Sequence, residues 1–343
     1  MGKLSRFQKI VFVANMFFAF LLFASYFVQY APIRYFPILS FLSLMVYYLM
    51  IINFLFMIFW MLSKKRNYAI PSLCILLLNF LFFDSFFKVP YKKGQDIEGL
   101  TILSYNVRAF DLYDWIPEKD TGNQIVEFTL GLDPDILVFQ EFDNRRTKDF
   151  ESYPYKFVNY IFHNGKKYVV QAIFSKYPII DKGALDFPNT TNNSIYVDLL
   201  YNHDTIRVYN GHLQSLRLYP SAISKENSGR LFKRLTNTFV KQEEQVEILK
   251  KHLSQVNYPT IICGDLNNTP FSRIYKLLKG DMLDTFNEAG RGFGRTYSLM
   301  GMPFRIDYIF ADRSFEVLDH QNFDVELSDH YPIMATLKFK SQE

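Results

Sequence analysis

The sequence predicts a membrane anchor of three transmembrane helices followed by a strand-rich α/β domain. Two observations lead to this prediction. The first 87 residues contain three long apolar stretches and only eight charged side chains. From residue 100 onward, short runs rich in β-branched and aromatic residues alternate with turns and one amphipathic helix, as in a globular α/β domain. We therefore divide the chain into an anchor (1–87), a linker (88–98) and a folded domain (99–343).

The three apolar stretches cover residues 10–31, 36–62 and 68–87. A helix needs about 20 apolar residues to cross the hydrocarbon core of a bilayer, and each stretch is close to that length or longer. A signal peptide would account for one stretch only, and no small-residue cleavage pattern follows the first. The alternative is a buried helical bundle of a soluble protein, but eight charges in 87 residues are too few for its surface.

The distribution of positive charges predicts the orientation of this anchor. The N-terminal tail and the loop at 63–67 carry three Lys or Arg residues each, the loop at 31–35 carries one, and the segment after the third stretch carries three. Six positive charges in the tail and the second loop, against four in the other two segments, favour the tail and the second loop on the cytoplasmic side. Three spans then place the folded domain of this multi-pass membrane protein on the non-cytoplasmic side, with Asp84 at the water interface.

Eight runs of the folded domain are typical of strands. They cover residues 100–107, 135–141, 168–175, 194–201, 205–212, 259–265, 304–311 and 332–339. A helix is expected over 222–254, because apolar residues recur there at steps of three or four and form one stripe that packs against a sheet. Its charged face is expected in solvent; the alternative for Arg230 and Arg234 is contact with a substrate or a membrane.

The charge balance limits the class of ligand. The chain has 38 Lys+Arg and 34 Asp+Glu, of which the first 87 residues hold 7 and 1, so residues 88–343 carry 31 and 33, a net charge of −2. Proteins that bind nucleic acid usually show a basic excess, because phosphate contacts dominate the affinity. The composition therefore does not favour nucleic acid as the partner.

Polar residues of acid–base or metal-binding type stand at several predicted strand ends. They are Asn106, Glu141, His212, Asp265 with Asn267, Asp307, and Asp329 with His330. Each alone is compatible with a turn, and the stretch CGDLNNTP (263–270) is rich in turn formers. However, Asp265 and Asn267 face the same side if the strand continues that far. Asp307 stands in an apolar strand and needs a partner, because an unpaired buried charge is costly.

Together these motifs resemble the endonuclease/exonuclease/phosphatase superfamily. The matching motifs are SYNVR, FQE, NGHL, GDLNNTP, RIDYIF and SDHYPI, and the resemblance covers about residues 100–340. The superfamily includes deoxyribonuclease I-like nucleases, apurinic-site endonucleases, inositol polyphosphate 5-phosphatases and neutral sphingomyelinases. The resemblance implies a four-layer α/β sandwich, in which two mainly antiparallel sheets pack between flanking helices.

The resemblance further implies a divalent metal ion. It assigns Glu141 as the principal metal ligand, with Asn106 and Asp329 close by. Mg²⁺ is the expected ion and Mn²⁺ the alternative, since hard cations of this kind take oxygen ligands and Mg²⁺ keeps several of its waters.

The same resemblance implies roles in the hydrolysis of a phosphate ester. Asp265 would orient or deprotonate the attacking water, and Asn267 would hydrogen-bond the transition state. His330, held by Asp307, would contact the scissile phosphate, and His212 would be a second imidazole facing it. Further substrate contacts are expected from Asn106, His212, Tyr168 and Thr296, the last of which is equally compatible with a plain strand residue.

We therefore expect a membrane-anchored phosphodiesterase or phosphatase, with a lipid-linked headgroup as one substrate class because the linker is short. A membrane-tethered endonuclease or exonuclease is the alternative. A non-catalytic binding module is disfavoured, since all the expected polar groups are present.

Overall fold

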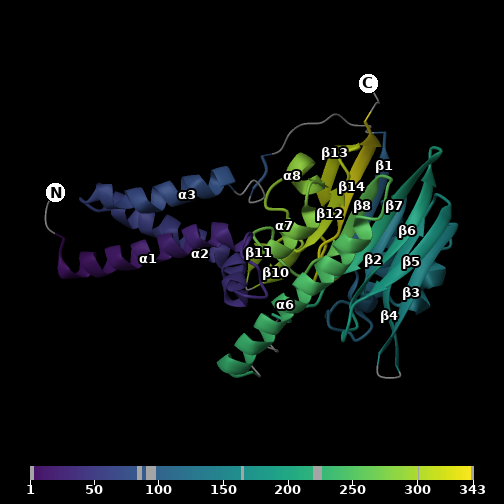
Figure 1. The fold of residues 1–343 in the computed structure, drawn as a ribbon, viewed down its shortest axis with the longest axis horizontal. Helices are drawn as coiled ribbons and strands as arrows, with labels where there is room; N and C mark the ends of the chain where they lie inside the picture. The colour runs from purple at the N-terminus through teal and green to yellow at the C-terminus, as the bar shows by residue number, and fades with distance from the viewer. Residues whose placement is uncertain are drawn as a thin grey trace. The chain divides into compact units, whose positions relative to one another are not determined.

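The computed structural model describes residues 4–82, 87–89, 98–163, 166–218, 226–299 and 301–340 (Figure 1). The chain forms two compact units. The first comprises Met1–Phe86 together with Asn268–Lys276, and the second comprises Phe87–Asn267 together with Leu277–Glu343.

Three helices form most of the first unit: α1 (Arg6–Val28), α2 (Ser40–Leu62) and α3 (Ile70–Phe82). Short 3-10 turns, η1 (Pro37–Leu39) and η2 (Arg66–Ala69), precede α2 and α3. Two helical segments, Arg6–Val28 and Pro37–Leu62, are long and apolar enough to cross a membrane. The prediction of three spans is therefore supported for two, because the described part of α3 has 13 residues and a span needs about 20. Asp84 lies outside the described residues.

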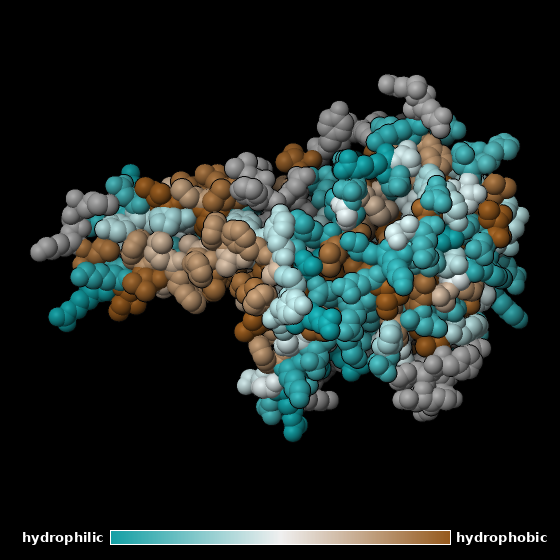
Figure 2. Space-filling model, in the orientation of Figure 1, coloured by the Kyte–Doolittle hydropathy of each residue, from teal (hydrophilic) through white to brown (hydrophobic). Residues whose placement is uncertain are grey.

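The first unit has a buried polar network within an otherwise apolar interior, and its outer surface is apolar as well. Asn15 accepts a hydrogen bond from Trp60 Nε1 at 3.1 Å and donates to Ser72 Oγ, which in turn donates to Asn53 Oδ1 at 3.3 Å. These four residues are fully buried and connect α1, α2 and α3. Large apolar side chains, by contrast, are more than half exposed along the outside, among them Phe7, Ile10, Val13, Phe20 and Leu62. Figure 2 shows this apolar surface in brown.

Two six-stranded sheets form the second unit. The first has the order β13-β14-β1-β2-β4-β3, and its strands are β1 (Leu100–Asn106), β2 (Ile136–Gln140), β3 (Tyr155–His163), β4 (Lys166–Ser175), β13 (Phe315–Asn322) and β14 (Ile333–Phe339). The second has the order β5-β6-β7-β8-β12-β9, and its strands are β5 (Ile179–Asp186), β6 (Asn193–Tyr201), β7 (Asp204–His212), β8 (Thr260–Asp265), β9 (Leu283–Asp284) and β12 (Asp307–Ala311). A small hairpin pairs β10 (Tyr297–Leu299) with β11 (Met302–Phe304).

Each large sheet is antiparallel except for one central pair. β1 and β2 are parallel in the first sheet, and β7 and β8 are parallel in the second. The two sheets pack on a common core of alternating side chains, so that Ile102, Ile136 and Val138 of the first face Val208 and Ile261 of the second. Two mixed sheets with helices on their outer faces thus agree with the predicted sandwich.

Helices cover the outer faces of the sheets. α4 (Thr121–Gly131) packs through Ile125 on Leu103 and Leu137, which point away from the second sheet. α6 (Ser228–Leu253) contacts the second sheet, where the Tyr209 hydroxyl lies 2.7 Å from His252 Nδ1. The remaining helical elements are η3 (Arg108–Asp111), η4 (Asn144–Phe150), α7 (Arg273–Lys279) and α8 (Thr285–Ala289).

Candidate active site

Strand register gathers the predicted site residues at one edge of each sheet. In the second sheet, the parallel β7–β8 pair aligns His212 with Asp265, and the antiparallel β8–β12 pair aligns Asp265 with Asp307. In the first sheet, the parallel β1–β2 pair aligns Asn106 with Gln140, directly before Glu141. Parallel strands end at the same edge, so the two central pairs each deliver two polar side chains to one place.

Polar side chains from both sheets approach the carboxylate of Asp265. Asn106 Nδ2, from the first sheet, donates to Asp265 Oδ2 at 3.2 Å. The Nε2 atoms of His212 and His330 lie 3.7 and 3.6 Å from the same oxygen. The Asp265 residue is only 1% exposed, so its carboxylate is surrounded by polar groups rather than by bulk water.

Asn267 lies in a turn and still contacts Asp265. Its φ of +50° places it in the left-handed region, so the strand geometry does not continue beyond Asp265. Its backbone N–H donates to Asp265 Oδ1 at 2.7 Å, and its Nδ2 donates to Asp265 Oδ2 and to the Leu213 carbonyl, both at 3.1 Å. The segment CGDLNNTP therefore forms a turn and also contributes side chains to the candidate site.

His330 and Asp307 form a buried pair. His330 Nδ1 lies 2.9 Å from Asp307 Oδ2 and 3.1 Å from Oδ1, which directs Nε2 toward Asp265. Thr296 Oγ1 accepts hydrogen bonds from the backbone N–H groups of Ile306 and Asp307. Thr296 is fully buried, so its contacts fix the start of β12.

Glu141, Asp329 and Arg108 form the accessible rim of the site. Their side chains are 42%, 38% and 29% exposed, whereas those of His212, Asp307 and His330 are at most 8% exposed. Arg108 Nε lies 3.5 Å from Asp329 Oδ2, and Glu141 Oε1 lies 3.8 Å from His212 Nε2. A ligand would thus meet the rim first and the buried groups beneath it.

The buried groups have shifted pKa values. Burial, opposed by the charge of His330 and reinforced by that of Asp307, raises the pKa of Asp265 to about 6. Burial by itself would lower the pKa of His330, but the negative charges of Asp307 and Asp265 raise it well above the usual value. Burial lowers the pKa of His212. Loss of hydration, followed by the charge of Asp329, raises the pKa of Glu141, whose carboxylate sits in crowded surroundings although part of the side chain is exposed.

Two sets of side chains offer ligand atoms to a metal ion. Asp265, Asp307 and His330 have ligand atoms within 4.8 Å of one another, but His330 and Asp307 already hydrogen-bond each other. The side chains of Glu141 and Asp329 are partly exposed. The Asn106 side chain contacts Glu141, and its amide oxygen accepts the Arg108 backbone N–H at 3.2 Å. This oxygen-only set fits a hard divalent ion that retains some of its waters.

The backbone beside the rim is strained. Arg108, Ala109, Phe110 and Asp111 all have φ between 42° and 55°, and Glu141 has φ +51°. Ala109 N–H donates to the Glu141 carbonyl at 2.8 Å, so the two strained segments support each other. Runs of non-glycine residues in the left-handed region are unfavourable and concentrate at functional sites.

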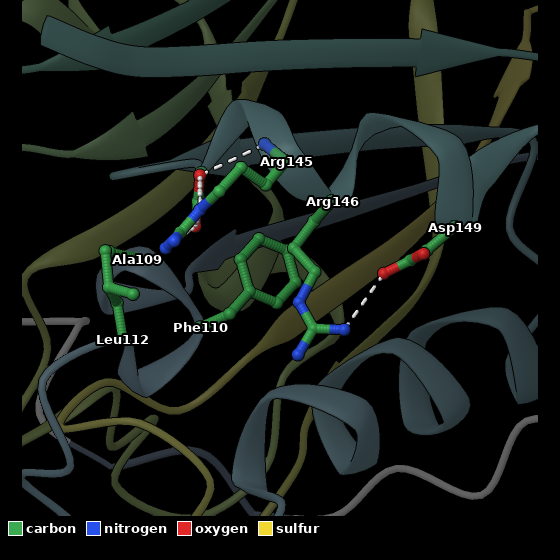
Figure 3. Close-up of a pocket in the computed structure, with 7 residues that line it drawn as sticks. Ala109, Phe110, Leu112, Arg145, Arg146 and Asp149 are labelled. Carbon is green, nitrogen blue, oxygen red and sulfur yellow. Dashed lines mark hydrogen bonds and ion pairs between the residues drawn. The ribbon is translucent and has the colours of Figure 1, made fainter.

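A cleft of about 410 Å³ adjoins this strained segment (Figure 3). The Phe110 ring lies beside Arg146 in this view, and Arg146 Nη1 is 3.1 Å from Asp149 Oδ2. Arg145 pairs with Asp143 at 2.6 Å. Both arginines of the cleft are thus neutralised by carboxylates.

The structure brings together Asn106, Glu141, His212, Asp265, Asn267, Asp307, Asp329 and His330. Tyr168 lies in β4, paired with Ile161, but its side chain is outside the part of the chain that the structure describes. Two neighbours of the site were missed. Arg108 stands within SYNVR, two residues after Asn106, and that spacing was the available signal. Trp115, whose ring lies 4.2 Å from the Arg108 guanidinium carbon, has no comparable signal in the sequence.

Comparisons with known proteins agree with this geometry. The family model described as "Endonuclease/Exonuclease/phosphatase family" matches residues 103–330, and a domain of unknown function matches residues 8–86. No curated protein sequence matches the chain.

Several solved structures share the fold. An endonuclease/exonuclease/phosphatase from Beutenbergia cavernae is 19% identical with a TM-score of 0.53, and the match covers 71% of this chain and 72% of that one. The mannosyl-6-phosphatase of Bacteroides thetaiotaomicron is 19% identical with a TM-score of 0.52, covering 70% and 100%. The human nocturnin catalytic domain with bound sulfate is 15% identical with a TM-score of 0.53, covering 71% and 94%. The family model matches about two thirds of the chain. The chain therefore belongs to the endonuclease/exonuclease/phosphatase family, whose members hydrolyse phosphate ester bonds.

Proposed function

We propose that this chain is a membrane-anchored, divalent-metal-dependent phosphoesterase. The observation that carries the proposal is the convergence of polar groups on one carboxylate, Asp265. Asn106 donates to it at 3.2 Å and Asn267 at 2.7 and 3.1 Å, and the Nε2 atoms of two histidines lie 3.6 and 3.7 Å away. Phosphate ester hydrolysis depends mainly on positioning and on neutralising charge. A cluster of carboxylates, amides and imidazoles can supply both the positioning and the neutralisation of charge.

Glu141, Asn106 and Asp329 would hold the metal ion, with Mg²⁺ as the first candidate and Mn²⁺ as the second. When bound, such an ion neutralises charge on the phosphoryl oxygens. The placement of Glu141 and Asp329 at the accessible rim supports the assignment, because the phosphate and the waters of the ion need space there. Asn106 is buried beneath them.

Asp265 would orient and deprotonate the attacking water. A pKa of about 6 leaves the carboxylate ionised at neutral pH while keeping it basic enough to accept a proton, which is the range in which general bases work best. Both amide hydrogens of Asn267 are directed at Asp265 and Leu213. Asn267 would thus position Asp265 in this conformation, and it would need to turn its amide to reach the transition state.

His330 would bind the scissile phosphate through Nε2–H. Asp307 holds the opposite ring nitrogen at 2.9 Å and fixes the tautomer, and the raised pKa keeps the ring protonated at neutral pH. His212 would be a neutral second donor, since burial lowers its pKa.

The substrate is proposed to be a phosphate ester available at the membrane surface, with a lipid-linked headgroup as the first class to test. Two fold relatives support an anionic phosphate ligand: one is named a mannosyl-6-phosphatase and another binds sulfate. A nuclease activity is the alternative within the family, and the net charge of −2 in residues 88–343 speaks against it.

The test is a hydrolysis assay on the full chain in nanodiscs of neutral lipid. Phospholipids, sphingomyelin, inositol phosphates, sugar phosphates and DNA are compared with Mg²⁺, with Mn²⁺ and with EDTA. We expect hydrolysis of at least one non-nucleic-acid ester, loss in EDTA and recovery on adding the metal. Cleavage of DNA in preference to all others would replace the lipid-headgroup proposal by the nuclease.

Asp265→Asn is the matched catalytic variant, because it keeps the shape of the side chain and removes its basicity. General base catalysis contributes about 10²–10⁴-fold, so we expect a loss of at least that size with an unchanged thermal unfolding midpoint. Hydrolysis close to the wild-type rate in this variant would disprove the assignment of Asp265.

A further inference from the structure

A cleft of about 520 Å³ in the second unit carries a surplus of positive charge. It lies between the segment that follows β7 and the N-terminal half of α6. Its charged lining residues are Arg217, Arg230, Lys233, Arg234, Lys241 and Glu226. Five cations and one carboxylate give a local charge of +4.

This surplus is local rather than general. The cleft in Figure 3 has two arginines and two aspartates among its lining residues. A third cleft, whose charged lining residues are Arg291, Arg295 and Asp324, has a net charge of +1. Residues 88–343 as a whole carry −2. A cleft with +4 is therefore not explained by a basic composition.

Two of the five cations contact other parts of the protein: Lys241 Nζ donates to the Asn189 carbonyl at 3.4 Å, and Arg234 has two partners. Arg234 Nε lies 2.9 Å from Glu226 Oε2, and Nη1 donates to the Leu216 carbonyl. Its side chain is 23% exposed. Among the residues that the structure describes, no carboxylate pairs with Arg217, Arg230 or Lys233, and all three side chains are exposed. These three cations are available to an anionic ligand.

The cleft is connected to the candidate active site by direct contacts. Gln214, which lines the cleft, follows His212 by two residues, a separation of about 7 Å along an extended chain. Gln242 Nε2 donates to the Gln214 carbonyl at 2.8 Å and lies 3.4 Å from the Asn267 carbonyl. The lining of the cleft and the candidate site are therefore joined through Gln214 and Gln242.

We propose that this cleft binds a phosphate group other than the scissile one. Arg and Lys side chains form strong charge-assisted hydrogen bonds with phosphate oxygens, and three available cations are enough to neutralise a phosphate dianion. The phosphate belongs either to the same substrate molecule, in which case the inference rests on the proposed function, or to an acidic phospholipid of the bilayer that holds the anchor.

The test uses the double variant Arg230→Gln/Lys233→Gln in the full chain, held in nanodiscs of phosphatidylcholine. The control is Lys250→Gln/Lys251→Gln, which removes the same charge from exposed positions at the other end of α6. Both pairs lie at the helix surface, and an unchanged thermal unfolding midpoint checks that each variant folds.

Two binding measurements in EDTA distinguish the two sources of phosphate. Calorimetry with pyrophosphate tests a soluble ligand, and co-sedimentation with vesicles of phosphatidylcholine containing about one third phosphatidylglycerol tests a lipid. We expect the cleft variant to bind about tenfold more weakly than wild type in at least one measurement, with the control within about twofold.

Weaker binding of pyrophosphate alone by the cleft variant assigns the cleft to the substrate. Weaker binding to the vesicles assigns it to the lipid. Unchanged binding in both measurements, or an equal loss in the control, would overturn the proposal. Neither measurement depends on hydrolysis, so a failure of the proposed function would leave its result intact.

Discussion

Asp307 acts on the site mainly as a positioning residue: it hydrogen-bonds His330, and its charge also helps to raise the pKa of Asp265. In Asp307→Asn the ring keeps an acceptor for Nδ1–H but loses the negative charge beside it. Positioning residues of this kind typically account for about 10–100-fold of activity. We expect kcat to fall by that amount, while KM changes less because the rim residues are untouched.

The comparison is steady-state kinetics on the best substrate of the panel. Asp204→Asn is the control, since Asp204 is exposed at the opposite end of β7 and its substitution should leave both constants unchanged. Wild-type kcat in Asp307→Asn would show that His330 does not need its partner.

His320 makes the stability of the second unit depend on pH. Burial lowers its pKa to about 4. Thr285 donates its hydroxyl to the Ile309 carbonyl and so accepts from His320 Nδ1–H at 2.8 Å, whereas Nε2 is buried without a hydrogen-bond partner among the described residues. Protonation would thus place a charge in the core.

The sign of the effect follows from the lowered pKa. Above about pH 6.5 the histidine is neutral in both states and contributes nothing. As the pH falls from about 6.5 to about 4, the unfolded chain takes up a proton that the folded chain refuses, and stability decreases by about 2–3 kcal/mol. We expect His320→Gln to remove this part of the acid sensitivity.

Thermal unfolding between pH 7.5 and about pH 4 measures this effect. The exposed His203 provides the control His203→Gln, which should keep the wild-type pH dependence. The interpretation would be wrong if His320→Gln and wild type lost stability in parallel.

At the scale of elements, Gly264 determines how closely β7 and β8 approach. Its φ is +143°, and a Cβ placed there would lie 1.9 Å from the Gly211 carbonyl oxygen. Because that obstacle is backbone, Gly264→Ala must separate the parallel pair that aligns His212 with Asp265. We expect a destabilisation of about 2–4 kcal/mol together with loss of activity.

Gly280→Ala is the matched control for this prediction. Gly280 also has positive φ, +48°, but an added Cβ would meet nothing within 4 Å. Backbone strain alone should cost about 1 kcal/mol and leave activity unchanged. Equal unfolding midpoints for the two alanine variants would show that the contact with Gly211 has no special weight.

At the scale of elements, the inner strands of the two large sheets could be predicted from the sequence, and the edge strands could not. Each of the eight predicted strands coincides with an observed one, and in the two large sheets these are the inner strands. The strands that the sequence did not reveal are β3, β5, β9 and β13, which are the four edges, and the small hairpin β10–β11. Edge strands such as β5 (IIDKGALD) and β13 (FEVLDHQN) carry charges that protect an open edge, and these charges obscure the alternating pattern.

The candidate site was predictable as a set of residues but not as a geometry. Strand ends are visible in the sequence, and parallel pairing then gathers them. The contact of Asn106 with Asp265 spans 159 residues and joins two sheets, so no local pattern encodes it. The left-handed backbone of Glu141 and Asn267 likewise depends on tertiary contacts, since neither residue is a glycine.

At the scale of the whole molecule, the first unit combines a buried polar network with an apolar outer surface. Asn15, Asn53 and Ser72 are buried and hydrogen-bonded, while Phe7, Ile10 and other large apolar side chains are exposed. In water this arrangement would be unfavourable, whereas in lipid the exterior is solvated and polar residues hold the helices together. We therefore expect the full chain to remain in the membrane pellet after an alkaline carbonate wash, and release into the supernatant would contradict the anchor.

The number of crossings determines the side of the membrane on which the second unit lies. α1 and α2 alone would return the chain to the side of the N-terminus, whereas a third crossing by α3 places residues from 88 onward on the opposite side. Ser72 in α3 contacts Asn15 and Asn53, and Ile70 and Leu77 are half exposed, but the described part of α3 is too short to count as a span by itself, so the third crossing stays a prediction. We expect a fluorescent or enzymatic reporter fused after Glu343 to signal on the non-cytoplasmic side, and the same reporter fused before Met1 to signal in the cytoplasm. Signals from both fusions in the cytoplasm would leave two crossings and would place the substrate of this enzyme inside the cell.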